Sequence, residues 1–397
     1  MRWPAAWKDP ALVDLLQGTG IDYLIIEPSL DTVRARAAEK GLHCVSRGQL
    51  PSGVSLIDGQ WPGVGGGGSI SAGPTGVPWV DSNGWHILLS AALHPDRAIW
   101  VDAAPPANLR GFPGAYLLAV ADVAAYGARW VVNLHSQLAE GLAARASAAM
   151  DLWKKIGAAT QFFGEHRDWA GFAPAAVVGV ISDFAAANEN FSHELLNLLA
   201  RAGQHYRVIP KDRVTPQAFD ALRAVIYADA QPPAAPLRQQ VRSFVENGGM
   251  LIASPSWGEA PGKAAKPDDE GPSFSVRTLG KGRIALAKQP PEDSYQWAND
   301  SVVLVSHRYD MVRIWNGGAT GSYYAISANR KRAVVHVMFY FGFGPDAASV
   351  RIAGRFRTTR ALTTDGRVEK IETIDQRDGI EVHLPQIPPY VAIELEA

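Results

Sequence analysis

The sequence predicts an α/β protein of several domains that ends in a small antiparallel β-sandwich. Its 397 residues exceed what one ordinary hydrophobic core supports. Two successive regions alternate short apolar runs with segments of helical periodicity, which is typical of parallel strands covered on both faces. After about residue 320, only short strand-like segments between turn residues remain. We therefore predict domains at residues 1–172, 173–320 and 321–397.

Residues 1–172 are predicted to form a partial or reduced β/α-barrel of the TIM type. Buried strands are expected at residues 23–26, 42–45, 54–58, 97–102 and 129–134, and helices at 10–17, 30–40, 82–92, 116–126 and 150–163. Five strand–helix units are too few for a complete eight-stranded barrel, and an open parallel sheet is the alternative.

Residues 173–320 are predicted to form a doubly wound α/β domain of the flavodoxin-like kind. Strands are expected at residues 177–181, 205–209, 224–228, 250–253 and 280–286, and helices at 192–202, 216–222 and 236–246. The sandwich strands are expected at residues 333–340, 349–352, 368–374, 380–384 and 390–395.

The composition argues against several classes of partner. A net charge of −1 gives no electrostatic case for nucleic acid or an anionic membrane. No apolar run reaches the ~18 residues of a membrane span. The single cysteine, Cys44, excludes internal disulfides and a four-cysteine zinc site. We expect no cofactor and no metal, and a protein that is cytoplasmic, or exported with its signal peptide absent from this chain.

Two motif-like stretches carry little chemistry. Gly63–Gly68 matches G-x-G-x-x-G, but the next helix is not expected before Ser82, so the strand-to-helix turn of a nucleotide site is missing. His193-Glu194 resembles the start of the zinc motif H-E-x-x-H, yet Asn197 replaces the second histidine. We interpret the first as a loop and the second as an ordinary helix.

The stretch Gly73–Trp85 combines two tryptophans with a carboxylate and a carboxamide. Flat indole faces beside such groups suit a sugar ring, although a rigid turn that seals a domain edge explains the same residues. The candidate sugar contacts here and on neighbouring segments are Trp61, Trp79, Asp81, Asn83 and Trp100.

Carboxylates at strand ends are the catalytic candidates. Glu27, Asp58 and Asp102 directly follow apolar strands, where barrel enzymes place catalytic groups. Glycoside hydrolysis needs two carboxyl groups across the scissile bond. We favour Glu27 as acid/base with Asp102 opposite, assisted by Asn133 and His135. The alternative is that such carboxylates only cap the following helices.

The order of these modules resembles family 42 β-galactosidases and related glycoside hydrolases. The middle domain is similar to class I glutamine amidotransferases, with Asp229 and its neighbours where the nucleophilic cysteine would be. Ile26-Glu27-Pro28 is similar to the Asn-Glu-Pro of the family's acid/base glutamate, and Asp102 falls where its nucleophile would be. The family's barrel is roughly twice as long, so the resemblance implies a shortened barrel.

This resemblance implies a β-galactosidase-like O-glycosidase, or a degenerate relative that acts on or binds carbohydrate, with a middle domain that builds an oligomer. The alternative class is a non-catalytic carbohydrate-binding or oligomer-forming protein, a homodimer or trimer. A third possibility is a small-molecule site around Ser182-Asp183 and Asp229.

Overall fold

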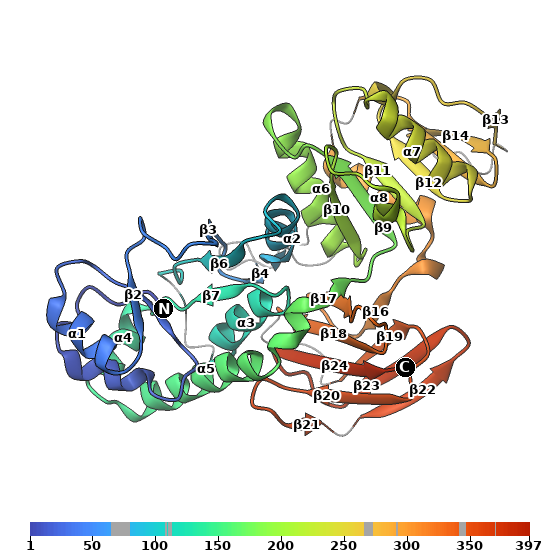
Figure 1. Ribbon diagram of the computed structural model, residues 1–397. Helices are drawn as coiled ribbons and strands as arrows, with labels where there is room; N and C mark the ends of the chain where they lie inside the picture. The colour runs from blue at the N-terminus through green and yellow to red at the C-terminus, as the bar shows by residue number, and fades with distance from the viewer. Residues whose placement is uncertain are drawn as a thin grey trace.

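The computed structural model describes residues 1–64, 80–107, 109, 113–265, 273–290, 293–340, 347–369 and 371–397. It is a mixed α/β protein with several β-sheets, which follow one another along the chain in three regions (Figure 1). None of its helices, over the ranges just given, is long and apolar enough to cross a membrane.

The first region contains two small parallel sheets, a two-stranded antiparallel sheet and their helices. Its strands are β1 (Tyr23–Ile25), β2 (His43–Val45), β3 (Val54–Asp58), β4 (Gly63–Val64), β5 (Val80–Asp81), β6 (Ala98–Asp102) and β7 (Arg129–Val131). Its helices are η1 (Pro10–Leu16), α1 (Asp31–Glu39), α2 (Gly84–Leu93), α3 (Pro113–Ala124), α4 (Ser136–Ala143), α5 (Ser147–Glu165) and η2 (Arg167–Gly171). The helix expected at residues 10–17 is a 3-10 helix, with Pro10 at its first position.

The first three residues join the two parallel sheets. The Arg2 N–H donates to the Val132 carbonyl at 3.0 Å, directly after β7, and the Trp3 N–H donates to the Ile25 carbonyl at 2.9 Å, at the end of β1. Arg2 and Ile25 also form a parallel bridge. The hydrogen-bonded order is therefore β3-β6-β7, then Met1–Trp3, then β1-β2. No strand was predicted at residues 1–3.

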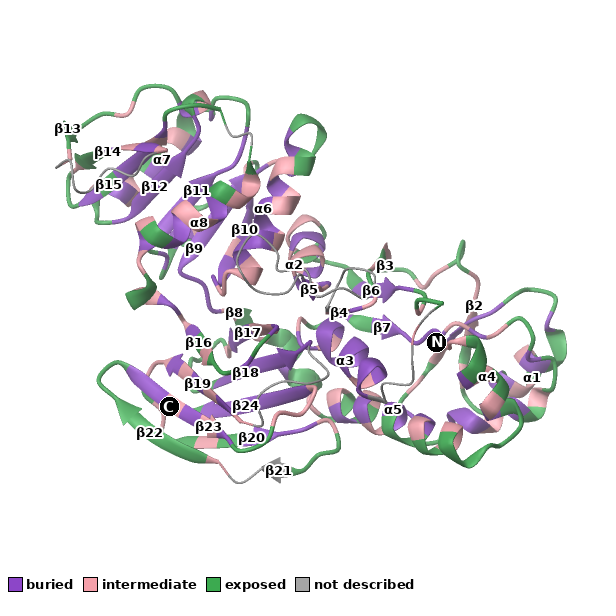
Figure 2. Ribbon diagram, turned by 180° about the vertical axis from the view of Figure 1, so that it is seen from behind, coloured by how far each residue is buried: buried purple, intermediate pink, exposed green. Residues whose placement is uncertain are grey.

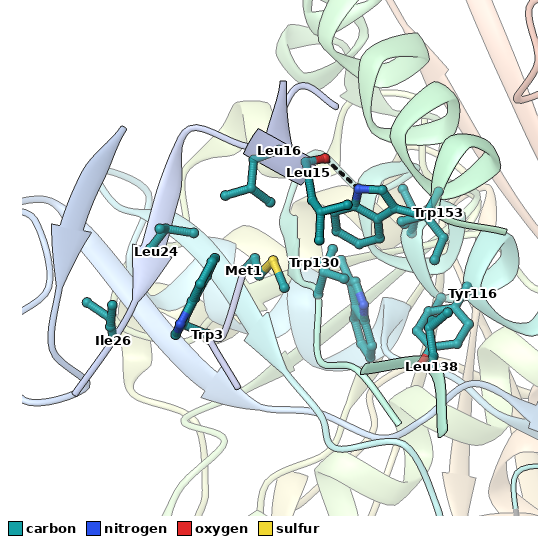
Figure 3. Packing of buried hydrophobic residues seen from close by; sticks show 14 of the residues in the cluster. Met1, Trp3, Leu15, Leu16, Leu24, Ile26, Tyr116, Trp130, Leu138 and Trp153 are labelled. Atoms are coloured by element: carbon teal, nitrogen blue, oxygen red, sulfur yellow. Dashed lines mark hydrogen bonds between the residues drawn. The ribbon is translucent and has the colours of Figure 1, made fainter. Parts of the chain in front are cut away.

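Alternating side chains of these strands divide between two hydrophobic clusters, as the pleat of a strand requires. Ile25, Trp100 and Val131 pack together on one side. Leu24 and Val101 point to the other side, where helices cover them. Figure 3 shows this second cluster, in which the Trp153 indole of α5 donates to the Leu15 carbonyl at 2.6 Å. Apolar side chains thus pack on both faces of β1, β6 and β7, as the continuous apolar runs predict.

The middle region is built on a seven-stranded sheet in the order β10-β9-β11-β12-β15-β14-β13. The strands are β9 (Val178–Ser182), β10 (Tyr206–Pro210), β11 (Ala224–Tyr227), β12 (Met250–Ala253), β13 (Lys263–Ala264), β14 (Phe274–Leu279) and β15 (Gly282–Ala287). The helices are η3 (Ala186–Asn188), α6 (Glu189–Arg201), η4 (Pro216–Phe219), α7 (Ala235–Glu246), η5 (Pro255–Trp257), α8 (Ser294–Val305) and η7 (His307–Tyr309). The first five strands in the sheet are parallel, whereas β14 and β13 are antiparallel.

Helices cover both faces of this sheet. Leucines of α6 and Trp297 of α8 pack on one face. Leu237 and Val241 of α7 pack on the other. The central strands β9, β11 and β12 are buried along their whole length (Figure 2). Helix α2 of the first region also packs against α6 and β10, so it connects the two regions.

The last region consists of two antiparallel sheets with a shared core. One has the order β16-β19-β23-β22, and the other β21-β20-β24-β18-β17-β8. The strands are β8 (Ala173–Pro174), β16 (Val312–Trp315), β17 (Thr320–Ile326), β18 (Arg332–Phe339), β19 (Ala348–Ala353), β20 (Thr358–Leu362), β21 (Val368–Glu369), β22 (Glu372–Gln376), β23 (Gly379–Leu384) and β24 (Tyr390–Glu396). Both β8 and β16 lie before residue 321 in the chain.

Candidate functional site

A cluster of polar side chains lies at the carboxyl ends of the first region's strands. Asp102, the last residue of β6, is only 7% exposed. Arg2 donates to one of its carboxylate oxygens. Asn133, which follows β7, donates to the other at 2.8 Å. We call Arg2, Arg47, Asp58, Asp102 and Asn133 the strand-end cluster.

Arg47 and Asp58 complete the strand-end cluster on its other side. Arg47 follows β2 and donates to Asp58, the end of β3, at 2.6 Å. Its guanidinium also lies 3.7 Å from the Asp102 carboxylate. β2 and β3 belong to different sheets, so this arginine bridges the ends of two strands that do not pair.

The Asn133 carboxamide is held by the backbone as well as by Asp102. Its NH₂ group is within 2.9 Å of the Ala103 carbonyl and 3.1 Å of the Val131 carbonyl. Asn133 is 6% exposed, so its rotamer is fixed by burial and by these bonds. The arrangement gives Asp102 two fixed donors on opposite oxygens, which suits a charge-balancing or acceptor role.

Glu27, the predicted acid/base, is exposed two residues after the end of β1. It has no ion pair or side-chain hydrogen bond with any residue in the described ranges. In the strand order, β1 and β6 are separated by Met1–Trp3 and β7, so Glu27 and Asp102 lie three strands apart. Three spacings of about 4.8 Å would put their strands about 14 Å apart in a flat sheet, and curvature shortens that separation.

His135 lies beside the strand-end cluster and caps a helix. Its Nδ1 accepts from the Gln137 N–H at 3.4 Å at the start of α4, and its Nε2 is 3.2 Å from the Ala107 carbonyl. The imidazole is half-buried. This capping corresponds to the structural alternative for a polar group after a strand.

Asn83 has a structural role instead of the expected sugar contact. It is 2% exposed, and its carboxamide bonds the backbone of Gln60 and the carboxylate of Asp122 at 2.8–2.9 Å. Burial raises the pKa of Asp122, against the hydrogen bonds from Tyr340 and Asn83 that lower it. Asn83 therefore ties α2 to α3, with no atom left for a ligand.

The tryptophan candidates are also mostly interior. Trp100 is 5% exposed and packs edge-on against Tyr23 at 5.1 Å. Trp61 packs edge-on against Tyr116 at 5.1 Å and Trp130 at 5.5 Å. These contacts make both indoles part of the hydrophobic clusters. Trp79, like most of Gly73–Trp85, lies outside the described residues.

The remaining residues of that stretch lie at the boundary with the middle region. Asp81 is half-buried in the short strand β5. Trp85 of α2 stacks on His86 at 5.1 Å and lies 5.6 Å from the His193 ring of α6. Its surroundings are those of a helix–helix contact between two regions.

The carboxyl edge of the middle sheet carries a second charged group, where the third sequence hypothesis placed a site. Lys211, after β10, bonds Asp183 at 2.8 Å and Asp229 at 2.7 Å. Burial is the largest single influence on the pKa of Asp183 and raises it, but the hydrogen bonds from Lys211, Asn188 and the Ala185 N–H together lower it below the ordinary value. Because Lys211 pairs with both carboxylates, we interpret these three residues as a structural ion-pair network. No group of three or more metal-binding side chains occurs in the described part of the chain.

Sequence reasoning missed Arg2 and Arg47, the two cations of the strand-end cluster. Arg2 lies in a short extended segment, Met1–Trp3, that ends at Pro4. This segment is too short to give the apolar run from which a strand could be predicted. Arg47 lies in a loop that no periodicity distinguishes. The only available signal was the need of a buried Asp102 for a cationic partner.

Comparison with known proteins identifies the fold class. No protein-family model and no curated protein sequence matches the chain. Solved glycoside hydrolases do match in structure. An α-L-fucosidase isoenzyme 2 from Paenibacillus thiaminolyticus aligns with a TM-score of 0.54 and 11% identity, over 92% of this chain and 70% of that one.

Two β-galactosidases align similarly. The enzyme from Bacillus circulans sp. alkalophilus gives a TM-score of 0.50 and 12% identity, over 78% of this chain and 61% of its own. A family 42 (GH42) enzyme from G. stearothermophilus gives 0.49 and 11%, over 92% and 66%. This chain thus spans about two thirds of their lengths. At the level of the fold, the predicted resemblance to β-galactosidases and related glycoside hydrolases is confirmed.

Proposed function

We propose that this protein binds carbohydrate at the carboxyl ends of the first region's strands, at the strand-end cluster. The observation that carries the proposal is the Asp102 carboxylate, fixed between Arg2 and Asn133 at the edge where barrel enzymes bind their substrates. The glycoside-hydrolase-like fold supports a saccharide as the ligand. Asp102, Asn133, Glu27 and His135 are the proposed contacts.

The strand order supports a reduced barrel beneath this site. Met1–Trp3 lies between β7 and β1, which makes a series of six parallel strands. Arg47 links the ends of β2 and β3, the two outer members of the series. We infer a closed ring of these six strands. Within it, β1 and β6 are three strands apart whichever way the ring is followed, so they lie on opposite sides.

Hydrolysis is the second candidate function, and the opposite placement of Glu27 and Asp102 favours it. Asp102, paired with Arg2, would act as the carboxylate at the anomeric carbon, and exposed Glu27 would protonate the leaving oxygen. The curvature of the ring decides whether the two carboxyls come within the ~5–9.5 Å that glycosidases use.

Aryl glycosides test this proposal directly. Turnover of a panel that includes the β-galactoside would be compared among the wild type, Glu27→Gln, Asp102→Asn and the control Glu140→Gln, an exposed residue of α4. Under the hydrolase hypothesis the first two variants lose about 10²–10⁴-fold in turnover and Glu27→Gln still binds sugar, whereas the control is unchanged. If the wild type binds sugar without turnover, the binding function remains and hydrolysis is excluded.

The same proposal includes an oligomeric assembly. A trimer formed through the middle region is what the family resemblance implies, and a homodimer is the alternative. Size-exclusion chromatography with light scattering measures it, and a monomer would contradict it. Carbohydrate is the only partner that the proposed function requires.

A further inference from the structure

A cavity lies where the three regions meet, away from the strand-end cluster. Its volume is about 360 Å³, within the ~300–1,000 Å³ of ordinary ligand sites. Its lining comes from the start of β5 and the end of α3, from the end of α6, and from the β16–β17 connection. The residues that carry the argument are Arg201, His307, Asp310, Arg313, Trp315 and Ser322.

The exposed indole of Trp315 is the most unusual feature of this cavity. Trp315 is 41% exposed, and only Val303 and Ile374 join it among the exposed large hydrophobic residues of the described chain. The Arg313 guanidinium lies over one face of its ring, at 5.7 Å from the centroid, which leaves the other face for a ligand. An aromatic face left in a polar cavity can pack against an apolar surface of a ligand.

The charged groups around Trp315 are already compensated by one another. Asp310 is 6% exposed and accepts from Gln204 at 2.9 Å and from His307 at 2.9 Å, with Arg313 3.6 Å away. On the opposite wall, Arg201 donates to the Val80 carbonyl at 2.6 Å and lies near carboxylates of the first and middle regions. An ionic ligand would have to break these pairs, which is costly for a buried carboxylate.

Paired polar groups can still accept and donate hydrogen bonds to hydroxyls. The guanidinium of Arg313 has five donors in a fixed plane, and the hydroxyls of Thr320 and Ser322 line the same cavity. A flat aromatic face beside hydrogen-bonding groups whose charges are already paired matches a pyranose ring, which has apolar C–H faces and a rim of hydroxyls. It matches neither a hydrocarbon nor an anion.

We propose that this cavity is a binding site for a neutral saccharide, stacked on Trp315 and hydrogen-bonded by Arg313. The choice of a saccharide rests partly on the proposed function, but the location does not. The site would hold sugar independently of the strand-end cluster.

Titration with methyl β-galactopyranoside and methyl β-glucopyranoside, followed by saturation-transfer NMR and calorimetry, tests the site. Trp315→Ala should weaken this binding at least 10-fold, and Trp315→Phe should retain part of it. The control Ile374→Ala, also an exposed apolar residue in the same four-stranded sheet, should stay within twofold. Raising NaCl from 50 to 500 mM should change the affinity less than twofold, since no net charge binds the ligand.

The outcomes separate the two sites. Asp102→Asn should leave binding at Trp315 intact, while Trp315→Ala should leave binding at the strand ends intact. Equal binding by wild type and Trp315→Ala overturns the inference, as does salt-sensitive binding of galacturonate in preference to the neutral sugars. If Asp102→Asn alone abolishes binding, the proposed function stands and this inference fails. If only Trp315→Ala abolishes sugar binding, this inference stands and the proposed function at the strand ends fails. Thermal unfolding verifies that each variant is folded.

Discussion

Asp102 shows how a single buried charge organises its surroundings. A carboxylate removed from water requires partners, and Arg2 and Asn133 supply one for each oxygen. Both partners come from chain segments far from β6 in the sequence. The pair therefore also fixes the first residues of the chain to the strand ends.

Removing Arg2 should destabilise the fold more than removing an exposed arginine. Arg2→Ala leaves Asp102 buried with Asn133 as its nearest donor, and we expect a loss of about 1–3 kcal/mol in the free energy of unfolding. Arg242→Ala, which breaks an exposed pair with Glu246, should cost about 0.5 kcal/mol or less. Urea unfolding measures both. Equal losses in the two variants would mean that the Arg2–Asp102 pair stabilises the fold no more than an exposed ion pair does.

Two buried histidines make the stability depend on pH. Burial lowers the pKa of His336 to about 3 and that of His205 to about 4, from an ordinary value of 6.5. The unfolded chain binds these protons below pH 6.5 and the folded chain does not, so stability is lost as the pH falls from 6.5. Each histidine accounts for up to about 2 kcal/mol between pH 6.5 and 5.

Urea midpoints at pH 7 and pH 5 test this pH dependence. His336→Gln should narrow the difference between the two midpoints, because it removes one of the titrating groups. The exposed control His94→Gln should leave the difference unchanged. The account is contradicted if both variants behave like the wild type.

Helix α2 connects the first and middle regions, and its packing depends on a glycine. A Cβ at Gly84 would lie 2.3 Å from the Tyr126 ring, so α2 can approach α3 only without one. We expect Gly84→Ala to cost about 1–3 kcal/mol. Gly164, on α5, has nothing within 4 Å of a built Cβ, and Gly164→Ala should instead stabilise by about 0.5–1 kcal/mol. Thermal unfolding distinguishes the two signs, and a stabilising Gly84→Ala would refute the packing argument.

The helices and strands with strong apolar periodicity could be predicted from the sequence. The parallel strands of the middle sheet, such as β9 and β11, lie within one or two residues of the expected ranges. Elements without a continuous apolar run were not predicted from the sequence. Met1–Trp3 is too short, while β14 and α8 mix polar and apolar positions that local pattern cannot assign.

The site was predictable only in part. Asp102 and Asn133 share an edge because parallel strands end together, and that followed from the strand order. The burial of Asn83 and Trp100 did not follow, since a polar or aromatic residue near a strand gives no sign of what will cover it. Long-range partners such as Arg2 and Tyr340 depend on tertiary packing that one sequence does not reveal.

Chain segments from outside residues 321–397 take part in the C-terminal sandwich. β8 at Ala173–Pro174 pairs with β17, and β16 at Val312–Trp315 pairs with β19, although both precede residue 321. Tyr340, after β18, donates to Asp122 of α3 at 2.5 Å. The sandwich is therefore completed by the rest of the molecule.

A fragment of residues 321–397 should consequently be poorly folded. It lacks β8 and β16 and exposes the edges of β17 and β19. A fragment of residues 310–397 keeps β16 and should show better dispersion of its amide signals in NMR. Equal and native-like dispersion in both fragments would show that β16 is dispensable for the sandwich.

The most direct test of the account is to locate a bound sugar by crystallography. Crystals soaked with a neutral pyranoside should show it against Asp102 and Asn133 at the carboxyl ends of β6 and β7, with Glu27 facing it. The same crystals would reveal any sugar at Trp315 as a separate site. Saturating sugar that leaves the strand ends empty would contradict the proposal that carbohydrate binds at the strand-end cluster.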